Sequence, residues 1–339
     1  MTGGDLLIGD ARIGPGARAE VDLPVARLAN HAPVTLTVLV RRGAAPGPTL
    51  FVSAAVHGDE VVGTEVIRRL LRHPALADLS GTLLAVPVVN AYGFAAGERC
   101  LPDRRDLNRS FPGARRGSLA AQLARLFFRE VVRRSDLGID LHTGGRHRAN
   151  LPHLRLAADD AAARGLAAAF GAPAVLRGAA PEGSLRAAAG GLPVLVYEGG
   201  EALRMDEEAV RAGLAGCLGV LRAAGMIPDG PLPRPPAWLD RGGWERAPEG
   251  GVVRHLASLG DAAREGDVLA VVGDPFGRGE EPVRARRDGV VIGRSHLPTA
   301  NRGDALYNLA VPGGGADPAA AIAAARAAWS DPGLAGGDR

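Results

Sequence analysis

The first two thirds of the chain alternate between apolar runs of strand length and amphipathic segments of helix length. Residues 34–41 alternate apolar and polar positions and residues 50–56 form a continuous apolar run, so both are predicted strands. Residues 60–72 place their apolar side chains on one helical face. Further strands are predicted at 82–89, 137–142 and 193–198, and further helices at 118–133, 160–170 and 206–224. Strands that alternate with helices predict a largely parallel α/β sheet.

One irregular stretch interrupts this alternation. Residues 90–117 are rich in Gly, Pro, Asn and Arg and show neither a strand nor a helix period. Loops of this length inside a compact domain usually carry function. We therefore expect part of the functional site to lie in this stretch.

The pattern changes in the last third of the chain. Residues 228–236 (PDGPLPRPP) cannot continue a helix and are predicted to be a linker. In residues 240–312, short apolar segments recur between Gly-Asp and Asp-Gly turn signals, which predicts a small all-β domain. The expected domains are a catalytic α/β domain with an N-terminal β segment at 1–230, a β domain at 237–313 and an Ala/Gly-rich tail at 314–339.

The charge composition excludes several functions. The chain has 40 basic and 37 acidic residues, for a net charge of +3, and every basic residue is an arginine. Without lysine, the chain has no Schiff-base lysine, no phosphate-loop lysine and no biotin or lipoate attachment site. The arginines are interleaved with acids, as in residues 103–106 (DRRD), so no nucleic-acid partner is expected.

Cysteine content and hydropathy indicate the compartment. Two cysteines, Cys100 and Cys217, make no disulfide framework. The first 16 residues lack a basic segment followed by an apolar one, and the uncharged run at 81–97 is short for a membrane span. We therefore expect a soluble cytoplasmic protein with no membrane partner.

The strongest chemical signal is His57-Gly58-Asp59-Glu60, where a buried strand ends and a helix begins. His57 and Glu60 are close enough in sequence to face one metal ion, and His142 ends another predicted strand. Ligands bind at the carboxyl ends of strands in open α/β sheets. Two histidines and one glutamate are a catalytic zinc set that leaves a coordination position for water. The alternative is that each is an isolated polar residue at a strand end.

Other polar residues near these positions receive supporting roles or none. Asp140 and Asp59 are both able to orient a ligand histidine through its second ring nitrogen. His147 and His153 are expected not to bind the metal, because three protein ligands suffice. Cys100 is expected to be a small packed residue and not a nucleophile.

Four sequence blocks carry a family resemblance. They are HGDE at 57–60, R-x-L-P-D-x-x-D-L-N-R-S-F-P-G at 99–113, D-L-H-T at 140–143 and Y-E-G-G at 197–200. In order and spacing the chain resembles the succinylglutamate desuccinylase/aspartoacylase family of the zinc carboxypeptidase clan, over about residues 30–312. The resemblance implies a zinc-carboxypeptidase-like α/β fold: a mixed sheet flanked by helices, with a small C-terminal all-β, barrel-sandwich-like domain. That domain would flank the mouth of the active site or mediate assembly of a homo-oligomer.

The resemblance also implies roles for individual residues. His57, Glu60 and His142 match the metal ligands, and Glu198 matches the catalytic glutamate. A second set lies in the 99–113 block. Asn108 and Arg109 match the pair that binds a substrate carboxylate. Arg99 matches the arginine that polarises the scissile carbonyl, and Arg104 and Arg105 are the alternatives for this role.

Together these features predict a zinc-dependent amidohydrolase with one Zn²⁺ per chain. It would deacylate a small N-acylated substrate, an N-acyl amino acid or a related small carboxylate, by attack of a metal-activated water. Glu198 would act as general base and then as proton donor. Two alternatives stay open: a metallocarboxypeptidase acting on a peptide terminus, and a non-catalytic metal-binding scaffold.

Overall fold

The computed structural model describes residues 4–157, 161–230 and 233–334. Its main element within these residues is a twelve-stranded sheet with the order β13-β16-β18-β11-β9-β8-β10-β7-β5-β6-β4-β3. These strands are β3 (Arg18–Arg27), β4 (Pro33–Arg42), β5 (Ala45–Ala54), β6 (Ser80–Val86), β7 (Leu137–Gly144), β8 (Arg148–Leu156), β9 (Ala174–Arg177), β10 (Val194–Glu201), β11 (Ala237–Arg246), β13 (Ala262–Ala263), β16 (Gly289–Ser295) and β18 (Ala305–Gly315).

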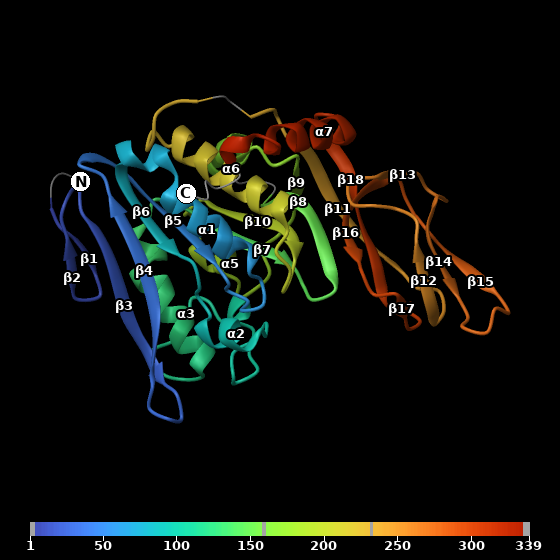
Figure 1. Cartoon of the computed structure of the whole chain (residues 1–339), viewed down its shortest axis with the longest axis horizontal. Helices are drawn as coiled ribbons and strands as arrows, with labels where there is room; N and C mark the ends of the chain where they lie inside the picture. Colours follow the sequence, from blue (N-terminus) through green and yellow to red (C-terminus); the bar gives the residue numbers. More distant parts are fainter. Residues whose placement is uncertain (1–3, 158–160, 231–232, 335–339) are drawn as a thin grey trace.

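Two smaller sheets accompany it. One is the hairpin of β1 (Leu6–Ile8) and β2 (Ala11–Ile13), and the other has the order β15-β14-β12-β17. The strands of the second are β12 (Gly251–His255), β14 (Val268–Gly273), β15 (Glu280–Arg284) and β17 (Thr299–Ala300). Figure 1 shows this four-stranded sheet at the end of the molecule remote from the N-terminus.

Helices lie on both sides of the large sheet. The α-helices are α1 (Val62–Arg72), α2 (Ala91–Ala96), α3 (Leu119–Glu130), α4 (Ala161–Phe170), α5 (Leu185–Ala189), α6 (Glu207–Ala223) and α7 (Pro318–Trp329). Short 3-10 helices are η1 (Pro74–Asp78), η2 (Leu107–Arg109), η3 (Val132–Arg134) and η4 (Pro332–Leu334). None of the helices in the described ranges is both long and apolar enough to cross a membrane.

The sheet is mixed, as the resemblance predicts. The largely parallel sheet predicted from the alternation of strands and helices is wrong, because only the central part of the sheet is built from crossover units. The central strands β6, β5, β7 and β10 run parallel to one another, whereas β10–β8, β4–β6 and β3–β4 are antiparallel pairs. The predicted α/β architecture with a β-rich C-terminal part is therefore confirmed. The predicted helix at 160–170 corresponds to α4, but its first residue lies outside the described residues, as do two residues of the predicted linker and the end of the tail.

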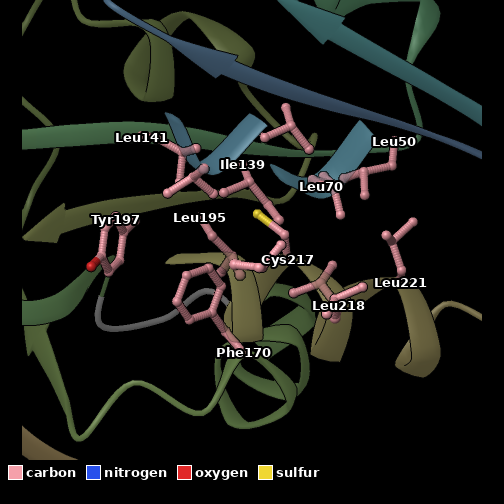
Figure 2. Packing of buried hydrophobic residues seen from close by; sticks show 14 of the residues in the cluster. Leu50, Leu70, Ile139, Leu141, Phe170, Leu195, Tyr197, Cys217, Leu218 and Leu221 are labelled. Carbon is pink, nitrogen blue, oxygen red and sulfur yellow. The ribbon is translucent and has the colours of Figure 1, made fainter. Parts of the chain in front are cut away.

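Alternation along the strands separates two cores. In β5, Leu50, Val52 and Ala54 join the core that packs under α1, α4 and α6, whereas Phe51 joins the core on the side of α3. Figure 2 shows the first of these cores, with Cys217 of α6 among leucine, isoleucine and aromatic side chains. Burial raises the pKa of the Cys217 thiol to about 12, so this cysteine is a packing residue.

The strands after residue 237 do not stand apart from the large sheet. Strand β11 pairs in parallel with β9 and antiparallel with β18, and β16 pairs with β8. Helix α7, near the end of the chain, packs against α6. The division into domains at residues 230 and 237 stays a prediction. The physical result is a continuous hydrogen-bonded sheet from β3 to the C-terminal strands, seen across the molecule in Figure 1.

Candidate active site

The candidate site lies where three parallel strands end. His57 follows β5, His142 lies near the end of β7, and Glu198 lies near the end of β10. Glu198 is the register partner of His142 in the parallel β10–β7 ladder. Register partners in neighbouring strands project to the same face of a sheet, about 5 Å apart. The general-base candidate is thus placed beside a candidate metal ligand by strand pairing alone.

The three predicted metal ligands converge. The Nδ1 atom of His57 lies 2.8 Å from Glu60 Oε1, and the Nδ1 atom of His142 lies 2.8 Å from Glu60 Oε2. One ligand atom of each residue lies within 4.8 Å of the others, and all three residues are buried. The backbone N–H of Thr143 also donates to Glu60 Oε2, at 3.2 Å. The arrangement is that of a His-Glu-His metal site.

The second nitrogen of each histidine faces a carboxylate. His142 Nε2 lies 2.8 Å from Asp140 Oδ2, and His57 Nε2 lies 3.1 Å from Asp106 Oδ1. The Ser53 hydroxyl fixes Asp140 in turn, donating to its Oδ1 at 2.8 Å. Histidines that bind metal through one nitrogen usually donate the other N–H to a carboxylate. The residues present therefore fit a bound metal ion.

The electrostatics of the cluster follow from the mutual contact of its three members. Burial disfavours the charged forms of all three ligands, but their mutual attraction outweighs it. The carboxylates therefore raise the pKa of His57 and His142, and the histidines hold the pKa of Glu60 well below its usual range. Anionic Glu60 is the form that binds a cation.

A close approach of two backbone segments fixes the His57 turn. A Cβ atom on Gly58 would lie 2.0 Å from the Gly93 carbonyl carbon and 2.2 Å from the Phe94 nitrogen in α2. Only glycine permits this contact. The Gly58 N–H donates to the Arg99 carbonyl oxygen at 3.3 Å, so the same contact brings Arg99 to the metal ligands.

Arg99 is tied to the ligand cluster by its guanidinium group. It contacts Glu60 Oε1 at 3.2 Å and Asp106 Oδ2 at 3.1 Å, and the flanking carboxylates raise its pKa against the effect of burial. Arg99 lines the cavity in front of the ligands, whereas Arg104 and Arg105 are exposed and are not among its lining residues. Of these three arginines, Arg99 is thus the one that contacts the metal ligands.

Both oxygens of Glu198 have partners. Asn150 Nδ2 donates to Oε2 at 2.9 Å, and Arg155 Nε lies 3.1 Å from Oε1. Glu198 is partly buried, with a side chain 15% exposed, and it lines the same cavity as His57 and His142.

The predicted carboxylate-binding pair lies at the rim of this cavity. The Asn108 side chain accepts a hydrogen bond from the Leu185 N–H at 2.8 Å through Oδ1. The Arg109 guanidinium is exposed and donates to the Asn108 carbonyl oxygen at 2.6 Å. Both residues line the cavity.

The cavity has a volume of about 680 Å³ and is shared by both parts of the chain. Trp244, Arg246 and Arg286 line it from the C-terminal strands and the loop after β15. The Arg148 guanidinium lies over the Trp244 ring, 5.2 Å from its centroid, and joins the two walls. A cavity of this size accepts a small molecule.

Comparison with known proteins identifies the family. The succinylglutamate desuccinylase/aspartoacylase catalytic domain matches residues 46–224. The chain belongs to this family. It is 33% identical over 301 residues to the N-alpha-acetyl-L-2,4-diaminobutyric acid deacetylase of Halomonas elongata, covering 82% of this chain and 85% of the relative. The resemblance drawn from the four sequence blocks is confirmed.

Solved structures agree with this family assignment. The product-bound ectoine utilization protein EutE (DoeB) from Ruegeria pomeroyi has 27% identity and a TM-score of 0.77, over 87% of this chain and 95% of that chain. A succinylglutamate desuccinylase from Silicibacter sp. TM1040 has 28% identity and the same TM-score, over 87% and 94%. This chain is accordingly an amide hydrolase of the desuccinylase/aspartoacylase family, a deacylase of N-acyl amino acids with a His-Glu-His metal site.

Some supporting residues of this deacylase differ from the sequence prediction. Asp106, not Asp59, contacts the second nitrogen of His57; Asp59 Oδ1 is buried without a hydrogen-bond partner among the described residues. The prediction for Asp59 was wrong because adjacency in sequence does not set side-chain direction. Asp106 carried one usable signal, its place three residues before Arg109 in the specific 99–113 block.

The residues given no chemical role stay outside the metal cluster. His153 is buried, its Nδ1 lies 2.7 Å from the Leu151 carbonyl oxygen, and burial with the nearby Arg155 charge lowers its pKa to about 3. Burial and the Asp106 charge raise the pKa of Cys100, which opposes thiolate formation. Asn150 and Arg155 were missed altogether, since neither is close in sequence to a recognisable block.

Proposed function

We propose that this family member is a zinc-dependent amidohydrolase in which Glu198 is the general base. The observation that carries the proposal is the pairing of Glu198 with His142 in adjacent strands, which brings a carboxylate to the edge of the His57/Glu60/His142 cluster. Two histidines and a carboxylate are a ligand set typical of catalytic zinc. Zinc bound there would polarise the substrate carbonyl and lower the pKa of a coordinated water to about 7.

Glu198 moves the proton in this proposal. Its carboxylate takes a proton from the attacking water and afterwards gives it to the leaving amine, so that one residue serves as base and then as acid. The hydrogen bond from Asn150 and the ion pair with Arg155 leave further lone pairs on the carboxylate for this exchange.

Arg99 supports the charge that develops during attack. Its guanidinium lies at the ligand cluster and lines the cavity, so it is placed to donate to the oxygen of the carbonyl under attack. A single donor of this kind is worth about 3 kcal/mol of transition-state stabilisation. Arg99 is therefore proposed to share stabilisation of the oxyanion with the metal.

Asn108 and Arg109 hold the substrate carboxylate. The Asn108 side-chain oxygen is occupied by the Leu185 N–H, which orients the Asn108 amide group. Arg109 has no carboxylate partner among the described residues and presents its guanidinium at the rim of the cavity. Arginine binds carboxylates in a bidentate geometry that fixes orientation as well as position.

The charge of the cavity narrows the substrate class. The lining carboxylates are Glu60, Asp140 and Glu198, and each is already paired with a histidine or with Arg155. Eight arginines line the same cavity within the described residues: Arg99, Arg109, Arg148, Arg155, Arg177, Arg186, Arg246 and Arg286. No lining carboxylate is left for a substrate ammonium group. We propose that the substrate side chain is neutral or acidic, unlike the diamino acid in the name of the Halomonas relative.

Metal analysis together with a substrate panel tests the proposal. We expect one zinc per chain and chelator-sensitive release of an amino acid from N-acetyl or N-succinyl amino acids. N-acetyl-glutamate or N-acetyl-aspartate should exceed N-acetyl-diaminobutyrate in kcat/KM at least about tenfold, the value of one modest ionic contact. A preference for the diamino acid would refute the charge argument.

The same panel separates the alternatives. Faster cleavage of dipeptides than of N-acyl amino acids would identify a metallocarboxypeptidase. Purification without metal, and no hydrolysis after zinc is added, would favour a non-catalytic scaffold. Zinc-dependent hydrolysis of N-acyl amino acids contradicts both.

A further inference from the structure

We infer that Asn150 and Arg155 are positioning residues for Glu198 and that the C-terminal strand β16 holds Asn150 in place. This inference rests on the proposed role of Glu198 as general base. It assigns the β-rich C-terminal part a direct contribution to catalytic geometry, besides forming a wall of the cavity.

Each carboxylate oxygen of Glu198 contacts a different side chain. Its Oε2 accepts from the Asn150 amide at 2.9 Å, and its Oε1 faces Arg155 Nε at 3.1 Å. Each carboxylate oxygen is thus fixed by a different side chain, one neutral and one cationic. The hydrogen bond to Oε2 and the ion pair to Oε1 restrict rotation about the last side-chain bond, so the remaining lone pairs of Glu198 keep a constant direction.

A ladder irregularity brings both partners to Glu198. In the antiparallel β10–β8 pair, Glu198 is opposite His153 and Gly200 is opposite Asn150, so the register shifts between these two pairs. Such irregularities locally re-aim side chains and are common next to active sites. Here the shift lets Asn150 reach Glu198 from one side, while Arg155, opposite Val196, reaches it from the other.

Strand β16 packs against the Asn150 amide group on the side of its oxygen atom. Gly293 is the register partner of Asn150 in the antiparallel β16–β8 pair. A Cβ atom on Gly293 would lie 3.2 Å from Asn150 Oδ1, 3.2 Å from Asn308 Cβ and 3.5 Å from the Trp244 ring. The first two distances are tighter than ordinary van der Waals contact, so the Asn150 amide already fills the space in front of Gly293. The Asn150 oxygen therefore points toward β16 and its amide nitrogen toward Glu198.

The side-chain N–H that Asn150 donates to Glu198 is therefore the group that the variants must test. Asn150→Asp keeps the shape but replaces the N–H donor with a second carboxylate facing Glu198, whereas Asn150→Ala removes the group. If Asn150 only fills space, the isosteric Asp variant retains activity and the Ala variant does not. If Asn150 orients Glu198, both lose activity.

The experiment measures kcat and KM of the zinc-loaded protein for its best N-acyl amino acid. We expect kcat to fall about 10- to 100-fold in Asn150→Ala, Asn150→Asp and Arg155→Met, with KM unchanged, as for displaced supporting residues. Arg155→Lys should recover part of the loss, because it restores a cation. Retained kcat in either Asn150 variant would overturn the inference.

Gly293→Ala tests the contribution of β16. Its new methyl group should displace the Asn150 amide and lower kcat in the same way, with KM and metal content unchanged. Gly273→Ala is the matched control: it lies in β14 of the C-terminal part, and its nearest contact would be the flexible Glu280 side chain at 3.5 Å. Equal kcat in the two glycine variants would remove β16 from the proposal.

A crystal structure of the zinc-bound Asn150→Ala protein gives a readout that does not depend on turnover. The inference expects the Glu198 carboxylate to rotate or to occupy more than one rotamer. If the wild-type protein hydrolyses no amide but Glu198 moves in this variant, the proposed function fails and the positioning inference stands. If Glu198 keeps its rotamer, the positioning inference fails, whatever the activity of the wild type.

Discussion

Each metal-facing histidine uses both of its ring nitrogens. One nitrogen turns toward Glu60 and the other toward an aspartate, Asp106 for His57 and Asp140 for His142. Asp106 has a further part, because it accepts a hydrogen bond from the Asn108 N–H at 2.8 Å and contacts Arg99. A single carboxylate thereby couples a metal ligand to the proposed oxyanion and substrate-binding residues.

We predict that Asp106→Asn weakens metal binding about 10- to 100-fold, since the partner of His57 loses its charge. Competition with a chelating indicator measures this affinity. Asp103→Asn is the matched control in the same loop, because Asp103 accepts from the Arg105 and Ala120 N–H groups and contacts no ligand. Equal metal affinity in wild type and Asp106→Asn would contradict the coupling.

A second residue-scale prediction concerns Glu130, whose side chain is only 4% exposed. Burial raises its pKa, but the Gly9 N–H and Arg134 outweigh that effect and lower it. A depressed pKa in the folded state contributes stability above the unfolded pKa of about 4.3, and that stability is lost as pH falls through the folded value. Glu130→Gln should lower the free energy of unfolding by about 2 kcal/mol at pH 7.

The pH dependence of this difference is the sharper test. Denaturant unfolding at pH 7 and at decreasing pH below 4.3 should show the gap between wild type and Glu130→Gln closing. Glu249→Gln, at an exposed position, should change stability by less than about 0.5 kcal/mol at any of these values. A pH-independent gap would assign the effect to packing.

At the scale of elements, helix α1 packs directly on two strands that carry the site. A Cβ atom on Gly63 would lie 2.7 Å from the Cβ atoms of Ala54 in β5 and Leu141 in β7. Leu141 precedes the ligand His142, and Glu60 lies just before α1. The glycine thus sets how closely the helix approaches the strand ends and, with them, the spacing of the ligands.

Gly63→Ala is expected to destabilise the protein by about 1–3 kcal/mol, as overpacking does, and to lower zinc content. Thermal unfolding and metal analysis measure the two effects. Gly165→Ala in α4 is the control, because a Cβ there meets nothing within 4 Å and should stabilise the helix by about 0.5–1 kcal/mol. A fully stable, fully zinc-loaded Gly63→Ala protein would show that α1 has room to shift.

At the scale of the whole molecule, the large sheet joins the C-terminal strands to the rest. Leu239 of β11 is fully buried opposite Leu176 of β9, in a core that also contains residues of β8, β16 and α7. The cavity draws its lining from both sides of this junction. Structural continuity of this kind favours unfolding as one cooperative unit.

We predict a single unfolding transition that two probes report alike. Trp238 and Trp329 pack in or against the core under α1, α4 and α6, whereas Trp244 lies in strand β11 and lines the cavity. The fluorescence of a variant that keeps only Trp244 therefore follows the C-terminal strands, whereas far-UV circular dichroism mainly follows helices α1 to α6. Leu239→Ala should move both transitions together, by about 2–5 kcal/mol. Separate midpoints for the two probes would mean that the C-terminal strands unfold independently.

Features that rest on local patterns could be predicted from the amino-acid sequence alone. The apolar runs ending in HGDE and D-L-H-T put metal ligands at strand ends, because strand length and turn chemistry are local properties. The DLNRSFPG block, being contiguous, identified the family without any tertiary information. Strand β9 escaped prediction, since its four residues are a strand only through pairing with β8 and β11.

Features that depend on pairing between distant segments could not be predicted and are seen only in the folded protein. The register of β10 against β7 brings Glu198 beside His142, and the shifted register of β8 adds Asn150 and Arg155. The 99–113 loop folds back to set Asp106, and not the adjacent Asp59, against His57. Local sequence does not predict strand register or the position of a loop, because both are set by the packing of the whole sheet.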